Sequence, residues 1–166
     1  MLNSASTHEF PPDQQSPIYN FKSHRNSKIH QLSEEHGDCI TLAEKLATIA
    51  KNGDSAELAE GVKIVKEYND TELEAHLQHE EQTILAPLVQ HHREHIDLCI
   101  MLGKEHGYIR TLVEDMTPET AKKDLADLAS ILTRHTLVEE EELFPLIESL
   151  FTEEQLDTVL NFVPWR

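Results

Sequence analysis

The chain has 166 residues, of which 39% are apolar and 5% aromatic, and its 31 Asp and Glu against 14 Lys and Arg give a formal net charge of −17. This length suits one domain with a real hydrophobic core, and the acidity argues against partners that need a basic surface, such as nucleic acid or anionic lipid. No apolar run approaches 18 residues and the first 30 residues hold no signal-peptide segment, so we expect no membrane span and a cytoplasmic protein.

The chain begins with an irregular stretch and continues as a run of helices. Residues 1–26 are rich in Ser, Pro and Asn and lack periodicity, which predicts an arm that is poorly ordered or lies over the domain. The domain itself is expected over residues 27–166. Apolar residues at helical spacing predict four long helices, at residues 27–51, 55–90, 92–114 and 119–150.

Breaking and capping residues mark the ends of these helices. Asn52-Gly53-Asp54 ends the first helix and caps the second, whose weak stretch at residues 68–70 can bend it. Pro87 is expected to kink or end the second helix, and Thr117-Pro118 to cap and open the fourth. Thr152 starts a short tail helix that ends near residue 163. The sequence therefore predicts an all-α, up-and-down four-helix bundle with an irregular N-terminal arm and a short C-terminal helix.

Two of the predicted helices carry a His followed four residues later by a Glu. The pairs are His76 with Glu80 and His135 with Glu139. Residues four apart share one helix face, so each pair places an imidazole and a carboxylate one turn apart. One such pair is common and means little, but the chain has two.

The pairs belong to an internal repeat. EHGDCITLAEKL, from residue 35, matches EHGYIRTLVEDM, from residue 105, and each segment precedes a helix with one His–Glu pair. We interpret this as two helical hairpins of one design, which pseudo-twofold packing would bring together at one level of the core. The candidate ligands are His36, His76, Glu80, His106, His135 and Glu139.

All six candidates fall on apolar stripes, which predicts a metal site. Without partners, each buried polar group would cost roughly 1–3 kcal/mol, against a typical domain stability of about 5–15 kcal/mol. Imidazole and carboxylate without thiolate suit iron, manganese or zinc. Six donors are too many for one tetrahedral zinc, whereas they suit two ions with the carboxylates able to bridge.

Four motifs, SEEHG, HLQHEEQTILAP, KEHG and HTLVEEEELFP, resemble the hemerythrin-like (HHE cation-binding) family over residues 30–150. The resemblance implies a four-helix bundle around a non-haem di-iron site, oxo- or hydroxo-bridged, with manganese or zinc as substitutes. It carries over the six candidates as iron ligands, with Glu80 and Glu139 bridging. Glu81 is the alternative to Glu80, because the following Pro stands one residue further from His76 than Pro145 does from His135.

Two positions differ from an oxygen-carrying hemerythrin. That protein has a second His four residues before the third-helix His and an Asp five residues after the last ligand His, where this chain has Leu102 and Glu140. The four-His, two-Glu pattern more closely resembles di-iron proteins that repair iron–sulfur clusters after nitrosative or oxidative damage. Those commonly carry an extra Cys-containing N-terminal domain, whereas the arm here has no Cys.

The expected function is therefore a di-iron protein that binds O₂ or NO or handles peroxide, in a stress response or in iron-centre repair. The alternatives are an O₂ or redox sensor or an iron store without turnover, and a structural bundle with degenerate metal affinity. Whether the chain is an enzyme, and whether it has a protein partner or forms a homodimer, is left open.

Other polar residues near these motifs have secondary interpretations. Within the acidic run 139–142 only Glu139 is expected to point fully inward, while Glu35, Glu105 and Glu140 are candidate partners of the ligand imidazoles. A second His cluster, expected to be a solvated helix start or a surface metal site, comprises His79, His91, His92 and His95. Cys39 and Cys99 are expected to be buried free thiols, too far apart for a disulfide.

Overall fold

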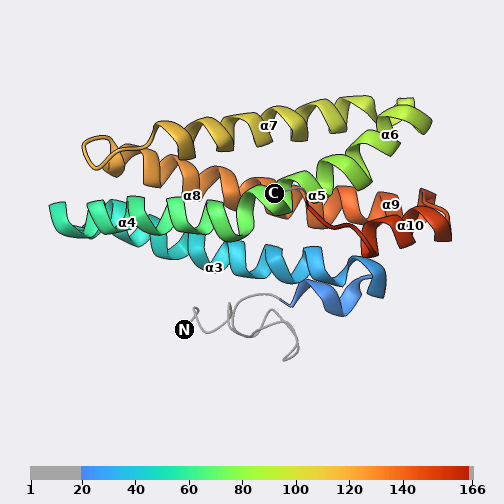
Figure 1. Ribbon diagram of the computed structural model, residues 1–166, viewed down its shortest axis with the longest axis horizontal. Coiled ribbons are helices and arrows are strands. Elements are labelled where there is room, and N and C mark those ends of the chain that lie inside the picture. Colours follow the sequence, from blue (N-terminus) through green and yellow to red (C-terminus); the bar gives the residue numbers. More distant parts are fainter. Residues whose placement is uncertain (1–19, 165–166) are drawn as a thin grey trace, which may run out of the picture.

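The computed structural model describes residues 20–164, and it confirms the predicted helical bundle. Four helical rods lie side by side and alternate in direction along the chain (Figure 1). The first and third rods are each one α-helix, α3 (His30–Asn52) and α7 (Ile96–Asp115). The other two rods are longer and contain π-helical turns.

The second rod spans residues 55–91, and the fourth spans residues 121–150. The second consists of α4 (Ser55–Tyr68), η3 (Asn69–Leu73), α5 (Glu74–Glu80), η4 (Glu81–Leu85) and α6 (Ala86–His91). The fourth consists of α8 (Ala121–Val138), η6 (Glu139–Leu143) and α9 (Phe144–Leu150). In Figure 1 the second rod, drawn in green, runs from beside α3 to beside the start of α7.

Short helices flank the rods. The 3₁₀ helices η1 (Phe21–His24) and η2 (Ser27–Ile29) lead into α3, and η5 (Arg93–His95) leads into α7. Most of the predicted arm, residues 1–19, lies outside the described residues, while η1 packs against α3. The predicted tail helix is α10 (Glu153–Leu160), which ends three residues earlier than expected. Between residues 20 and 164, no helix is both long and apolar enough to cross a membrane.

The connection between α3 and α4 follows the predicted capping chemistry. The Asp54 side chain accepts a hydrogen bond from the Glu57 backbone N–H, and Glu57 accepts one from the Asp54 N–H, at 2.8 and 2.9 Å. A Cβ on Gly53 would stand 2.6 Å from the Ile49 carbonyl oxygen. Only glycine fits this close approach, so Gly53 allows α4 to turn back directly along α3.

The fourth rod begins later than predicted. Residues 118–120 form a turn and α8 begins at Ala121, with Thr120 rather than Thr117 at the N-cap. The Thr120 hydroxyl accepts from the Thr117 N–H at 3.0 Å, and the Thr120 N–H donates to the Thr117 carbonyl at 3.1 Å. Local threonine bonds thus hold this segment as a turn, and Pro118 lies outside the helix.

Two of the three π turns coincide with the His–Glu pairs. Glu80 is the last residue before η4 and Glu139 is the first residue of η6. The Ala86 N–H bonds the Glu81 carbonyl and the Phe144 N–H bonds that of Glu139, both five residues back. A proline follows each of these bonds directly, where the α-helical pairing is already interrupted, so its missing N–H costs little. The second rod accordingly continues past Pro87 to His91 instead of ending there.

The hydrophobic core is divided into two layers by the predicted ligands. On α3, for example, Leu32 belongs to one layer and Leu46 to the other, with His36 between them in sequence. The same order holds on α7, where Leu102 and Ile109 flank His106. Apolar packing above and below therefore shields most of the polar level between the layers from bulk water.

Candidate metal centre

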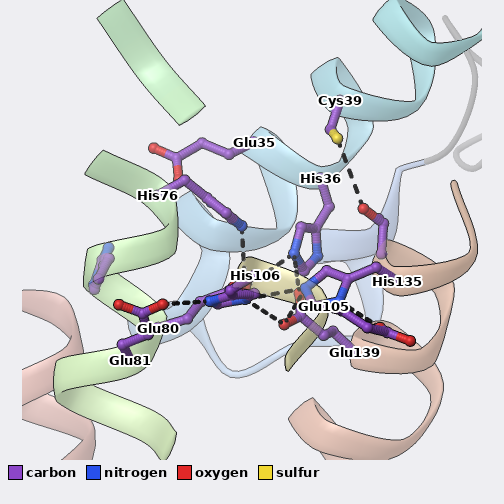
Figure 2. A network of polar contacts seen from close by, with 12 residues as sticks. Glu35, His36, Cys39, His76, Glu80, Glu81, Glu105, His106, His135 and Glu139 are labelled. Atoms are coloured by element: carbon purple, nitrogen blue, oxygen red, sulfur yellow. Dashed lines mark hydrogen bonds and ion pairs between the residues drawn. The ribbon is translucent and has the colours of Figure 1, made fainter. Parts of the chain in front are cut away.

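Four imidazoles, one from each rod, converge on one level of the bundle. Figure 2 shows them meeting around two glutamates, and they are His36, His76, His106 and His135. The first, third and fourth of these residues are 1%, 0% and 3% exposed. The His106 and His135 Nε2 atoms lie 3.1 Å apart, so the rings meet through the same kind of atom.

Glu80 and Glu139 lie between the two imidazole pairs and are both fully buried. Glu80 Oε2 is 3.1 Å from His36 Nε2 and 3.0 Å from His76 Nε2. Glu139 Oε2 is 2.9 Å from His135 Nε2, while its Oε1 is 3.0 Å from His36 Nε2. Glu80 Oε1 is also 3.4 Å from His106 Nε2, so each carboxylate contacts imidazoles from both halves of the bundle.

These donors form two four-residue groups, and in each the ligand atoms lie within 4.8 Å of one another. The groups share both glutamates and differ in their histidines; they are His36, His76, Glu80 and Glu139, and Glu80, His106, His135 and Glu139. A cation in each group would have two imidazoles of its own, with both carboxylates available as bridges. The structure thus brings together all six residues singled out from the sequence.

Every inward-facing imidazole has an outer carboxylate on its Nδ1 atom. The four distances are between 2.6 and 2.8 Å, and the pairs are His36 with Glu140, His76 with Glu35, His106 with Glu81, and His135 with Glu105. An Nδ1–H that donates to a carboxylate fixes the tautomer and leaves the Nε2 lone pair facing the centre. This is the arrangement that a metal-ligating histidine needs.

The outer pairs obey the repeat found in the sequence. Glu35 and Glu105, each just before a ligand His, bond the imidazole on the following rod. Glu81 and Glu140, each just after a central Glu, bond the imidazole on a rod of the other hairpin. The carboxylate ring therefore has the same pseudo-twofold symmetry as the ligands.

The structure agrees with one expectation about an individual glutamate and corrects another. Glu81, the alternative ligand, is 33% exposed and reaches the outer side of His106, so the structure places Glu80 rather than Glu81 at the centre. Glu140 is 2% exposed, so Glu139 is not the only inward residue of the run 139–142. The π turn η6 starts here, and consecutive residues of this turn point at the centre and at the outer side of His36.

The electrostatics of the protein groups favour proton retention on the imidazoles. Burial by itself lowers the pKa of His36, but Glu139, Glu140 and Glu80 outweigh it and raise that pKa well above its usual range. Burial also lowers the pKa of His106, but the neighbouring carboxylates outweigh burial and raise this pKa to about 11. Burial and Glu80 raise the pKa of Glu139, but His135 and His106 prevail and hold it at about 2. The central carboxylates are therefore ionised and call for positive charge.

The donor set fits a metal ion. Among the described residues, Glu80 Oε1 and both Glu139 carboxylate oxygens are buried without a hydrogen-bond partner. An extra proton on an imidazole Nε2 offsets the carboxylate charge in the metal-free protein. Once that proton leaves, each Nδ1 proton points outward and the neutral imidazoles turn lone pairs toward these oxygens, so acceptors face acceptors. A cation that accepts electron pairs from both kinds of atom resolves the conflict, and nitrogen plus carboxylate oxygen suits iron, manganese or zinc.

Apolar side chains shield this level. Phe144 is fully buried and stacks on His36 with ring centroids 5.1 Å apart. Leu102, at the position that distinguishes this chain from an oxygen-carrying hemerythrin, is also fully buried and belongs to the same apolar layer. That layer closes one side of the site with hydrocarbon and adds no further donor.

The remaining histidines and cysteines lie apart from the ligand groups. His79 is not part of a cluster with His91, His92 and His95: it is buried, and its Nε2 bonds the Val159 carbonyl of α10 at 2.7 Å. None of these four occurs in a ligand group within residues 20–164. The predicted free thiols are confirmed, since Cys39 and Cys99 are both buried and unpaired.

Sequence reasoning missed three arginines that contact the outer carboxylates; they are Arg25, Arg110 and Arg134. It also missed Glu81 as the partner of His106. The signal for Glu81 was present, because the repeated motif is His-x-x-x-Glu-Glu, which makes Glu81 the counterpart of Glu140.

The comparisons with known proteins give one result. The family model for the hemerythrin HHE cation binding domain matches residues 27–147. No curated protein and no solved structure matches the chain.

Proposed function

The chain belongs to the hemerythrin HHE cation binding domain family, and from this premise we propose that its polar level binds two iron ions. The observation that carries the proposal is the pair of donor groups that share Glu80 and Glu139. Each group supplies two imidazole nitrogens and carboxylate oxygens at one place, with charge that needs a cation. Manganese and zinc suit the same donors and are substitutes.

The protein's own residues hold and insulate the centre. The outer carboxylates keep a proton on each Nδ1 and orient each ring, and the two apolar layers exclude water. Three of the four rings are nearly inaccessible to solvent. Iron, when bound, supplies redox chemistry and positions that a small molecule can occupy.

We infer that the small molecule is O₂, NO or peroxide, and that the role is a stress response or the repair of iron centres. Four imidazoles and two carboxylates do not fill all coordination positions of two iron ions, and the apolar surroundings suit a small, weakly polar ligand. Leu102 gives no further imidazole, which favours reactivity over simple oxygen carriage.

Metal analysis with optical spectroscopy tests this function. We expect about two irons per chain after aerobic purification, an absorption typical of an oxo-bridged pair, and a changed spectrum when NO is added to the reduced protein. The His135→Ala variant should lose metal, whereas the matched surface variant His95→Ala should keep it. A protein that takes up no iron would refute the proposal, and binding of both gases without consumption of peroxide would favour a sensor or a store.

A further inference from the structure

The outer carboxylates are themselves held from outside, and mostly by arginine. Three of the four have a guanidinium partner at 2.5–3.1 Å, and the pairs are Arg25 with Glu140, Arg110 with Glu81, and Arg134 with Glu105. Arg110 grips Glu81 through Nη1 and Nη2 at once, and Arg25 also bonds the Glu140 backbone carbonyl. Each of these imidazoles is therefore oriented by a carboxylate that is itself fixed.

The fourth corner differs. Glu35, which bonds His76, is held by the neutral amide of Gln31 at 3.0 Å, and no Lys or Arg of residues 20–164 pairs with it. His76 is also the most exposed of the four rings, with 10% of its side chain accessible against 0–4% for the others. The pseudo-twofold symmetry of the centre is broken at this corner.

The difference has two physical consequences. A guanidinium orients a carboxylate and neutralises it, whereas a neutral amide hydrogen-bonds the carboxylate but leaves its charge in place. The Glu35 carboxylate is 30% exposed and lies next to the most exposed ligand ring, so its negative charge faces solvent with His76 as its charged partner. The Glu35 carboxylate attracts an approaching cation. The His76 ring is the ligand whose orientation is least firmly held, so a cation leaves most easily past it.

We propose that the Glu35–His76 corner is the port through which metal ions enter and leave the centre, and that the position served by His36 and His76 is the exchangeable one. The position served by His106 and His135 is the permanent one, because Arg110 and Arg134 support both of its rings through Glu81 and Glu105. The inference rests on the proposed function, since it concerns the exchange of the metals that the centre is proposed to hold.

Release of iron to a chelator tests the port. The full chain is loaded with two equivalents of Fe(II) under argon and mixed with excess ferrozine, and the coloured complex is followed in time. We expect two phases of one iron each. Gln31→Arg gives Glu35 the arginine that the other carboxylates have, at a surface position four residues away on the same helix, and should slow only the fast phase, by about tenfold.

The matched variant acts on the other position. Arg134→Gln should speed only the slow phase, and Arg134→Lys should speed it less, because lysine keeps the positive charge but not the planar guanidinium. Thermal unfolding of the metal-free variants should equal that of the wild type, so the effect is not one of general stability. Two bound irons that leave in one phase, or a Gln31→Arg variant that leaves the fast phase unchanged, would overturn the port alone. A chain that binds no iron would instead overturn the proposed function.

Discussion

Glu80 and Glu81 are adjacent in sequence and have different tasks. One residue of helix turns the side chain by about 100°, so Glu80 points to the centre and Glu81 to the outer side of His106. Burial raises the pKa of Glu81, but His106 and Arg110 overcome it and lower the pKa to about 2. Both side chains are therefore carboxylates at neutral pH, and direction and burial separate their roles.

Substitution of each glutamate by glutamine separates these roles. Glu80→Gln removes a bridge common to both groups, so we expect less than one iron per chain after desalting. Glu81→Gln removes only the orientation of His106, so two irons should bind with an affinity about 10–100-fold lower. Chelator competition measures both, and equal losses in the two variants would contradict the assignment of Glu80 as the ligand.

Metal uptake should release protons. Burial opposes a rise in the pKa of His76, but Glu80 and Glu35 raise it to about 9, and that of His106 is about 11. Both imidazoles hold an extra proton at pH 7 in the metal-free protein, and a metal must displace it. Apparent affinity should thus increase as the pH rises from 6 to 8. Calorimetry in buffers of different ionisation enthalpy measures the protons released, and a pH-independent affinity would be the contrary result.

At the scale of elements, the π turn η6 holds two consecutive glutamates at one site, with Glu139 at the centre and Glu140 on the outer side of His36. The π turns also mark the limit of what periodicity predicts, because a 3.6-residue pattern finds a helix but not the inserted residue of a π turn. The weak stretch at residues 68–70 predicted an irregularity, and η3 lies there. The turns η4 and η6 had no signal of their own beyond the prolines that follow them.

The C-terminal helix α10 packs on the bundle through buried Leu156 and Val159, and one buried histidine of the second rod adds a polar contact to it. The His79 Nε2–H donates to the Val159 carbonyl, and its ring stacks on Phe162 with centroids 4.9 Å apart. Burial lowers the pKa of His79 despite a smaller opposite effect of the Val159 bond. His79 is therefore harder to protonate when α10 is docked than when it is undocked, where the imidazole takes up a proton below about pH 6.5.

Acidification from pH 7.5 to 5.5 should consequently loosen α10. Amide-exchange protection factors of residues 153–160 should fall, because docking free energy is lost as the pH drops through the ordinary histidine range. His79→Gln keeps a donor for Val159 but does not titrate, so its protection should change less. Equal losses in both proteins would assign the effect to other groups.

At the scale of the whole molecule, the charged level interrupts the core, so we expect the stability of the fold to depend on metal. Two apolar layers pack separately, and only helix backbones and the central residues join them. A ligand that binds only the folded state adds about 2.7 kcal/mol when present at 100 times its Kd, which corresponds to roughly 5–10 °C in Tm for a chain of this size.

Iron should therefore raise the Tm of the metal-free protein by several degrees. Differential scanning calorimetry under argon, with and without Fe(II), measures the shift. Glu80→Gln is the control, since it lacks a shared ligand and should show little or no shift. An identical shift in both proteins would indicate that iron acts elsewhere on this acidic chain.

The sequence was sufficient for the bundle and for the six central residues, because each lies on an apolar stripe and the repeat pairs them. It was insufficient for their surroundings. The contacts of Arg25 with Glu140 join residues 115 apart in the chain, and neither spacing nor composition indicates which surface arginine meets which carboxylate. The predicted start of α8 was two residues early, because Thr117 and Thr120 bond each other reciprocally as in a helix cap while residues 118–120 form a turn.

The pseudo-twofold symmetry of the central donors and outer carboxylates limits how the two proposed metal positions can differ. Two separate copies of the first hairpin, residues 27–91, would present the same six central donors as the whole chain, as a homodimer. In such a homodimer every substitution appears twice, so both positions must stay alike. Joining the halves in one polypeptide removes that constraint: Gln31 can serve one corner while Arg134 serves its counterpart. Covalent fusion of two similar halves is thus what allows a symmetric ring of donors to acquire unequal corners.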